Sequence, residues 1–195
     1  MRRLILGGSF NPIHHGHLAC SRAVAEAMGF GRVTLIPTAQ PPHKAEAATL
    51  ADAAHRVAML RVSTAGDGLF DVDEIEMGRA GPSFTIDTAA ELARRGEGPI
   101  HWLIGADMLL YLPKWHRVDE LLTQVNFVIM ARPGWPIDWA KLPANLQRLQ
   151  ANVVEAPLMS ITASNIRERV SRGLPIRYLT PDPVCEYIAH HGLYR

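Results

Sequence analysis

Short apolar runs alternate with longer amphipathic stretches along almost the whole chain. The apolar runs predict strands at Leu4–Leu6, Val33–Pro37, Leu69–Val72, Ile100–Ile104, Phe127–Met130 and Val153–Val154. Apolar residues near helical spacing predict helices over Gly16–Met28, Leu50–Arg61, Asp87–Arg95, Val118–Gln124, Asn165–Arg172 and Pro183–His191. The stretch Ile137–Gln150 contains proline and tryptophan and fits neither pattern.

The alternation of strands and helices predicts an α/β fold with a doubly wound parallel sheet covered on both faces. We expect a single domain over residues 1–195, in which residues 160–195 form a C-terminal helical part. Ligands of such sheets bind at the carboxyl ends of the strands. The residues that follow Leu6, Pro37, Ile104 and Met130 are therefore the first candidates for a functional site.

Composition and charge narrow the class of ligand. The chain has 195 residues, of which 48% are hydrophobic and 20% are charged, which is ordinary for a globular domain. A formal net charge of +1 argues against nucleic acid or a membrane as partner, so a bound anion should be small and local. Cys20 and Cys185 form no CxxC motif, and the first apolar run is too short for a signal peptide. We expect a soluble, cytoplasmic protein, and whether it forms a homo-oligomer stays open.

The segment after the first predicted strand combines a glycine-rich turn with two histidines. Gly7 and Gly8 lack Cβ atoms, so their backbone can approach a ligand closely. His14 and His17 stand three apart at the start of the next predicted helix, and in a helical turn they share a face. A helix N-terminus attracts anions through its unpaired N–H groups and its partial positive charge. The segment therefore predicts a phosphate site.

Simpler interpretations of these residues stay open at this point. A Gly-Gly pair after a strand is often only a tight turn, and a lone histidine is often a core or surface residue. Paired histidines can also bind zinc, but no cysteine or acidic residue stands here at a metal-ligand spacing. The dinucleotide fingerprint and the P-loop motif are both absent, which disfavours a dinucleotide-dependent dehydrogenase. A nucleotide-binding regulatory domain without chemistry remains an alternative.

Two motifs resemble the signatures of the nucleotidyltransferase superfamily that carries a His-x-Gly-His or Thr-x-Gly-His motif. His14-His15-Gly16-His17 matches the first signature fully. Residues 161–167 resemble the second, Ile-Ser-Ser-Thr-x-Ile-Arg, but Ala163 replaces a serine, so no hydroxyl contact is expected there. Alone, this second segment is equally well explained as an N-cap before a basic helix. The resemblance implies a Rossmann-like nucleotidyltransferase fold, in which the motif histidines contact the phosphates of ATP and Arg167 is available to its β- and γ-phosphates.

Other segments are similar to the nicotinate-mononucleotide adenylyltransferase family of bacteria, which makes deamido-NAD. They are Pro41–Lys44, Ser83–Thr88, Gly105–Asp107, Lys114–Trp115, Arg132–Gly134, Tyr178–Pro181 and Gly192–Tyr194. The resemblance implies that the adenylyl group of ATP is transferred to nicotinate mononucleotide, with release of pyrophosphate. Nicotinamide mononucleotide and phosphopantetheine stay alternative acceptors, and the segments around Thr85 and Trp115 disfavour the second.

The resemblance also implies binding roles for individual residues. Those expected to contact ATP are Gly7, Gly8, Ser9, Phe10, His14, Gly16, His17, Gly105, Asp107, Arg132, Ile161, Ser164 and Arg167. Those expected to contact the mononucleotide are Ser9, Asn11, Lys44, Thr85 and Trp115. The residue types fit, because an indole can stack on a pyridine ring and a carboxylate can accept from ribose hydroxyls. Trp115 is alternatively a core residue, and Lys44 a solvated surface charge.

The expected reaction needs no nucleophile from the protein. A phosphate monoester has a second pKa of about 6, so the acceptor phosphate is largely dianionic at neutral pH. It can attack the α-phosphorus of ATP in line, while pyrophosphate leaves. The catalytic candidates are His14, His17, Lys44 and Arg167, as groups that align and neutralise the phosphates. We expect Mg²⁺ to accompany ATP, held mainly by phosphate oxygens and water rather than by a protein metal site.

Overall fold

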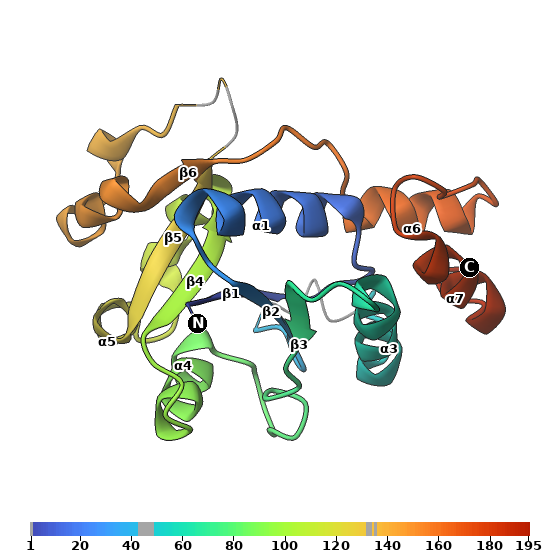
Figure 1. The fold of residues 1–195 in the computed structure, drawn as a ribbon, viewed down its shortest axis with the longest axis horizontal. Helices are drawn as coiled ribbons and strands as arrows, with labels where there is room; N and C mark the ends of the chain where they lie inside the picture. The colour runs from blue at the N-terminus through green and yellow to red at the C-terminus, as the bar shows by residue number, and fades with distance from the viewer. Residues whose placement is uncertain (1, 43–48, 132–133, 135) are drawn as a thin grey trace.

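A computed structural model of the chain describes residues 2–42, 49–131, 134 and 136–195. Its strands form one parallel sheet of six strands in the order β3-β2-β1-β4-β5-β6 (Figure 1). The strands are β1 (Arg3–Gly8), β2 (Arg32–Pro37), β3 (Phe70–Val72), β4 (Ile100–Gly105), β5 (Val125–Ala131) and β6 (Val153–Glu155). The α-helices are α1 (His15–Met28), α3 (Ala53–Thr64), α4 (Thr85–Arg94), α5 (Val118–Gln124), α6 (Ala163–Ser171) and α7 (Asp182–His191). The predicted α/β fold with a parallel sheet is confirmed.

Helices cover both faces of the sheet. Leu4 of β1 belongs to the buried cluster beneath α1, α3, α6 and α7, whereas its neighbour Ile5 belongs to the cluster beneath α4 and α5. Figure 1 shows α1 and α4 on opposite sides of the strands. Successive side chains of a strand point to opposite faces, so a strand that is buried on both faces must be apolar at every position. This explains why the strands are largely apolar runs in the sequence.

The C-terminal helices pack on the same buried cluster as α1. Ile166 of α6 and both Val184 and Ile188 of α7 are buried in it. The expectation of a single domain with a helical part over residues 160–195 stays a prediction. Among the described residues, no helix combines the length and the apolar character that crossing a bilayer requires.

Several predicted boundaries shift by a few residues. Helix α3 begins at Ala53 rather than Leu50, and α4 begins at Thr85 rather than Asp87. Helix α1 ends as predicted, because Gly29 adopts the left-handed conformation, with φ at 68°, that terminates a helix. The unassigned stretch Ile137–Gln150 contains 3₁₀ helices, η3 (Trp139–Lys141) and η4 (Ala144–Asn152). Three leucines of this stretch pack on the α4 and α5 side of the sheet, and they are Leu142, Leu146 and Leu149.

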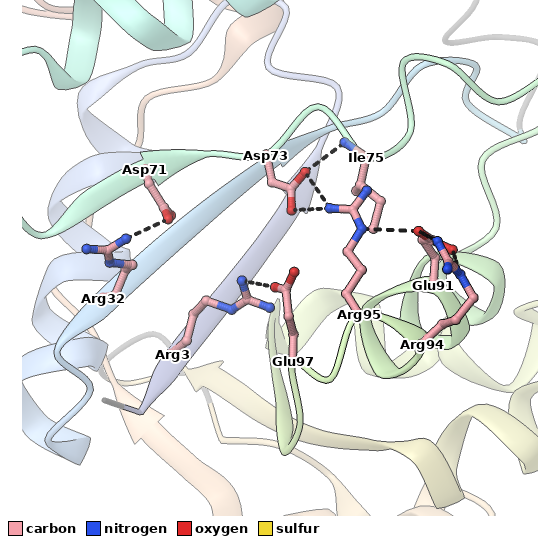
Figure 2. A network of polar contacts seen from close by, with 9 residues as sticks. All are labelled: Arg3, Arg32, Asp71, Asp73, Ile75, Glu91, Arg94, Arg95 and Glu97. Carbon is pink, nitrogen blue, oxygen red and sulfur yellow. Dashed lines mark hydrogen bonds and ion pairs between the residues drawn. The ribbon is translucent and has the colours of Figure 1, made fainter.

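Ion pairs join β2 to β3, β1 to the turn after α4, and the residue that follows β3 to the C-terminal end of α4 (Figure 2). Its pairs are Arg3–Glu97, Arg32–Asp71, Arg95–Asp73, Arg95–Glu91 and Arg94–Glu91. Solvent-exposed pairs of this kind contribute about 0–1 kcal/mol each. Every guanidinium in Figure 2 has an acidic partner, so the network holds elements together and does not concentrate positive charge for an anion.

Candidate active site

The glycine-rich segment lies between β1 and α1, at the carboxyl edge of the sheet. Gly7 and Gly8 are the last residues of β1, and a Cβ on Gly7 would lie 2.6 Å from Cζ2 of Trp102. Phe10 is 2% exposed, and its ring meets the ring of His17 edge to face at 5.2 Å. Position 7 therefore requires a residue without a side chain, because Trp102 packs closely against it. The buried ring of Phe10 anchors the turn that follows.

His14 and His17 form a stacked pair at the N-terminus of α1. Their ring centroids lie 3.7 Å apart with an interplanar angle of 24°, so they share a face as the three-residue spacing predicts. The backbone N–H of His14 donates to Nδ1 of His17 at 3.3 Å. A neutral imidazole that accepts at Nδ1 carries its proton on Nε2, so His17 retains an N–H donor on that side of its ring.

Both imidazoles are neutral at pH 7 in the free protein. Burial lowers the pKa of His14 to about 4, with a smaller contribution from the charge of His15. Burial also lowers the pKa of His17 well below its ordinary value, and the nearby His14 lowers it further. Nδ1 of His14 is buried and makes no hydrogen bond within the described part of the chain. An incoming anion would therefore meet polar groups without first having to displace a protein partner of that nitrogen.

A cavity of about 310 Å³ opens beside the histidine pair. Four of its lining residues were expected at the ATP site, and they are His14, Gly16, His17 and Ile161. Its other walls are largely apolar and include Leu6, Cys20, Leu103, Met130, Ala156 and Met159. The cavity therefore suits an anion at its histidine end and a flat apolar group against its walls. The apolar walls were missed, because the pattern of apolar runs shows where strands end but not which side chains face a cavity.

The second motif lies against the first. Nη1 of Arg167 on α6 donates to the backbone oxygen of Asn11 at 2.8 Å, and Nη2 lies 3.4 Å from Oγ of Ser164. Thr162 caps α6, because its Oγ1 accepts from the N–H of Asn165 at 3.1 Å. The N-cap interpretation of this segment is therefore confirmed. Ile161, Thr162 and Ala163 of the same segment line the cavity, and a contact of this segment with phosphate stays a prediction.

Relatives of the chain carry one consistent name. A family model described as Cytidylyltransferase-like matches residues 5–169. A probable nicotinate-nucleotide adenylyltransferase of Roseiflexus sp. (strain RS-1) is 42% identical over 98% of this chain and 96% of its own length. Another, from Saccharopolyspora erythraea, is 40% identical over 98% of this chain and 88% of its own length. The chain belongs to the nicotinate-nucleotide adenylyltransferase family.

Solved structures support the fold of this family member. The Plasmodium falciparum nicotinic acid mononucleotide adenylyltransferase, solved as a complex with NaAD, superposes with a TM-score of 0.76 at 16% identity. The match covers 100% of this chain and 98% of that one. At this level of identity the likeness concerns the fold, which is the Rossmann-like nucleotidyltransferase fold expected from the two motifs.

Asn11 and Ser9, two of the predicted acceptor residues, lie in the segment between β1 and α1. The side chain of Asn11 makes three hydrogen bonds to protein atoms: Nδ2 donates to the oxygen of Thr49, and Oδ1 accepts from the N–H of Ala51 and the hydroxyl of Tyr194. These bonds give Asn11 a role in holding its own loop. Direct contact with a mononucleotide stays a prediction for this residue and for Ser9.

Thr85 and Trp115 lie on the α4 and α5 side of the sheet. Thr85 opens α4, where first-turn N–H groups have no partner within the helix. The ring of Trp115 is half-buried and meets Phe127 edge to face at 6.1 Å. Phe84 and His116 stack at 4.3 Å, which brings the start of α4 next to the residue that follows Trp115. The two predicted acceptor positions are thus connected through their neighbours.

The structure describes some, but not all, of the ATP residues expected after β4 and β5. Asp107 is exposed on the 3₁₀ helix η1 (Ala106–Leu110), and its Oδ1 would lie 2.4 Å from a Cβ on Gly105, so the carboxylate folds back over that glycine. The predictions for Lys44 and Arg132 lie outside the residues that the structure describes.

Proposed function

We propose that this chain transfers the adenylyl group of ATP to nicotinate mononucleotide and so makes deamido-NAD and pyrophosphate, a step of NAD biosynthesis. The observation that carries the proposal is the cavity in which the stacked His14–His17 pair faces the capped start of α6. Membership of the nicotinate-nucleotide adenylyltransferase family supports the same activity. The Plasmodium falciparum enzyme of the same fold was solved as a complex with NaAD, and this ligand fits the same chemistry.

The ATP half of the site follows from the polarity of the cavity. A triphosphate fits its histidine end, where Nε2 of His17 and the backbone N–H groups of Gly16 in α1 and Ala163 in α6 can donate hydrogen bonds. Arg167 adds a fixed positive charge beside Asn11. The base would rest on the apolar walls formed by Leu103 and Met130. In this assignment Gly7, Gly8, Phe10, Gly16, Gly105, Asp107, Arg132, Ile161 and Ser164 complete the ATP site.

The acceptor half combines groups from three segments. The N-terminus of α4 at Thr85 would bind the nicotinate carboxylate, since a helix N-terminus favours a negative charge. Trp115 would offer its exposed ring edge or face to the pyridine. Ser9, Asn11 and Lys44 would bind the acceptor phosphate. A carboxylate ligand at a helix N-terminus is the reason to prefer nicotinate over nicotinamide as acceptor.

The chemical step follows from these positions. An oxygen of the acceptor phosphate attacks the α-phosphorus, a new P–O bond forms, and the bond to the β-phosphate oxygen breaks, with pyrophosphate taking the electron pair. His14 and His17 act as hydrogen-bond donors to the phosphates, and no proton needs to be removed from the nucleophile. Arg167 and Lys44 balance the charge of the departing and incoming groups. Alignment and charge stabilisation are therefore what the protein supplies.

Magnesium and location complete the proposal. Within the described ranges, no three His, Cys, Asp or Glu side chains lie together as a metal-binding group. We propose that Mg²⁺ accompanies ATP and is held mainly by phosphate oxygens and water. We also propose that the enzyme works in the cytoplasm on these small molecules.

An acceptor comparison tests the proposal. Pyrophosphate release from ATP would be measured with nicotinate mononucleotide, nicotinamide mononucleotide and phosphopantetheine in separate reactions. We expect release with nicotinate mononucleotide, less with the amide, and none with phosphopantetheine. ATP binding without release for any acceptor would contradict the proposal and favour the regulatory-domain alternative. Release that depends on phosphopantetheine would identify a different member of the superfamily.

A further inference from the structure

Arg56 is a buried arginine beneath the acceptor half of the site. It lies on α3 and is 1% exposed. Its guanidinium donates to four backbone carbonyls: Ser9 at 2.9 Å, Thr38 at 2.7 Å, Ala39 at 3.3 Å and Ala51 at 2.9 Å. Among the described residues no carboxylate forms an ion pair with it. A buried charge is costly and is retained only where its hydrogen bonds are well satisfied, so this arrangement needs a purpose beyond packing.

The four carbonyls belong to three separate segments. Ser9 follows β1, Thr38 and Ala39 follow β2, and Ala51 precedes α3. One planar group therefore fixes the spacing of the two strand ends and the entry to the helix. A guanidinium suits this task, because its donors lie in a rigid fork and point in several directions at once.

The same scaffold extends to the start of α4. Gln40, directly after Ala39, accepts from the N–H of Ser83 at 2.8 Å, and its own N–H donates to Oγ of Ser83 at 3.2 Å. Ser83 stands two residues before Thr85. A continuous chain of hydrogen bonds and covalent links thus runs from Ser9, through Arg56, to the helix end that would bind the pyridine carboxylate.

Buried polar side chains support this chain of contacts from the far side. Glu76 is 4% exposed, and its Oε1 accepts from Oγ1 of Thr88 on α4 at 2.6 Å. The carboxylate is close enough to Arg56 for their charges to interact favourably. It also interacts with Ser83 and with the backbone of Ala39. The segment between Arg56 and α4 is therefore held on both sides.

We propose that Arg56 is a positioning residue for the acceptor mononucleotide. Its guanidinium sets the distance between Ser9, on the phosphate side of the acceptor, and Thr85, on the ring side. This inference rests on the proposed function. It predicts that loss of the guanidinium disturbs the acceptor site more than the ATP cavity, which is lined by residues of α1, β4, β5 and α6 that Arg56 does not contact.

The test compares Arg56→Lys and Arg56→Ala with the wild-type enzyme at steady state. Misplacement by about 1 Å costs up to about 10²-fold in rate, so we expect KM for nicotinate mononucleotide to rise about 10-fold or more in Arg56→Lys. KM for ATP should change by less than about 3-fold, since none of the four carbonyls that Arg56 binds belongs to a residue that lines the ATP cavity. Added ethylguanidinium should restore part of the acceptor affinity of Arg56→Ala, because it can occupy the space left by the side chain.

Leu60→Ala is the matched control for lost stability. Leu60 lies on the same helix, is 0% exposed and contacts the apolar core, so its loss destabilises the fold without touching the acceptor segments. It should leave the ratio of the two KM values unchanged. Circular dichroism shows which variants fold. If Arg56→Ala does not fold, the two KM values of Arg56→Lys, which keeps the charge, test the positioning role.

Two outcomes separate this inference from the proposed function. Equal changes of both KM values in Arg56→Lys, or unchanged values with no effect of ethylguanidinium on Arg56→Ala, would overturn the positioning role alone. Wild-type enzyme without adenylyl transfer to any acceptor would overturn the proposed function first.

Discussion

His14→Gln tests whether the buried histidine pair takes up a proton when a triphosphate binds. Burial is the main cause that lowers the pKa of His14 from 6.5 to about 4, so the free protein holds this imidazole neutral. At 1.36 kcal/mol per pH unit, charging it in the free protein costs roughly 3 kcal/mol. The attraction between the charged imidazole and one phosphate charge about 4 Å away is about 4 kcal/mol at an effective dielectric constant of about 20. The two energies are similar, so bound ATP can restore the proton near neutral pH.

The structure also assigns the place of that proton. Nδ1 of His17 already accepts from the backbone N–H at position 14, so it cannot bind a proton without breaking this bond. Nδ1 of His14 has no such partner within the described residues. The rings are stacked 3.7 Å apart, so two positive charges would repel. We therefore expect one proton at most, located on His14.

Because the ATP complex binds more protons than the free enzyme, affinity for ATP should rise as the pH falls from about 8 to about 6. The assay is titration calorimetry with a non-hydrolysable ATP analogue and Mg²⁺ in two buffers of different ionisation enthalpy. Wild-type enzyme should take up a substantial fraction of one proton more than His14→Gln does. The nucleotide titrates equally in both experiments, so the difference belongs to the histidine. Equal uptake by the two proteins, or proton release by the wild type, would refute the reasoning.

Three further substitutions test single features. His17→Ala should lower turnover in a pyrophosphate-release assay by at least ~10²-fold with the fold intact, because it removes one preorganised donor. Thr162→Ala should lower the free energy of unfolding in urea by about 1 kcal/mol, because it removes the N-cap of α6. Gly7→Ala should lower it by about 1–3 kcal/mol, because the added Cβ would lie 2.6 Å from Cζ2 of Trp102.

A specific result would contradict each of these three predictions. Near-normal turnover of His17→Ala would remove that residue from the mechanism, and His190→Ala, an exposed histidine on α7, is its control. An unchanged unfolding free energy in Thr162→Ala would mean that water replaces the cap without loss. In Gly7→Ala the same result would mean that Trp102 moves aside freely.

The layout of the sheet was predictable because its strands are buried on both faces. Val33–Pro37 is apolar except for Thr34, and Phe127–Met130 is apolar throughout, a pattern that indicates strands covered on both faces. The position of the segment from Gly7 to His17 was predictable for a related reason, since it follows directly from β1, and ligands of such sheets bind at that edge. His14 and His17 stack because they occupy the N-cap and N3 positions of α1, which lie next to each other at a helix start.

The scaffold beneath the acceptor half was not predictable from local pattern. Arginine is mostly exposed in proteins, and the burial of Arg56 depends on carbonyls from distant segments. The start of α3 at Ala53 and the tie between Asn11 and Tyr194 depend on the same long-range contacts. Spacing along a chain carries no information on such partners.

The central claim is that the α-phosphorus of ATP moves to the acceptor phosphate. ATP radiolabelled at its α-phosphorus would be incubated with the enzyme and nicotinate mononucleotide, and the products separated by chromatography. The account predicts that the label appears in deamido-NAD, in equal amount to the pyrophosphate released. Label that stays in ATP, or that appears in AMP or ADP without a dinucleotide, would contradict it.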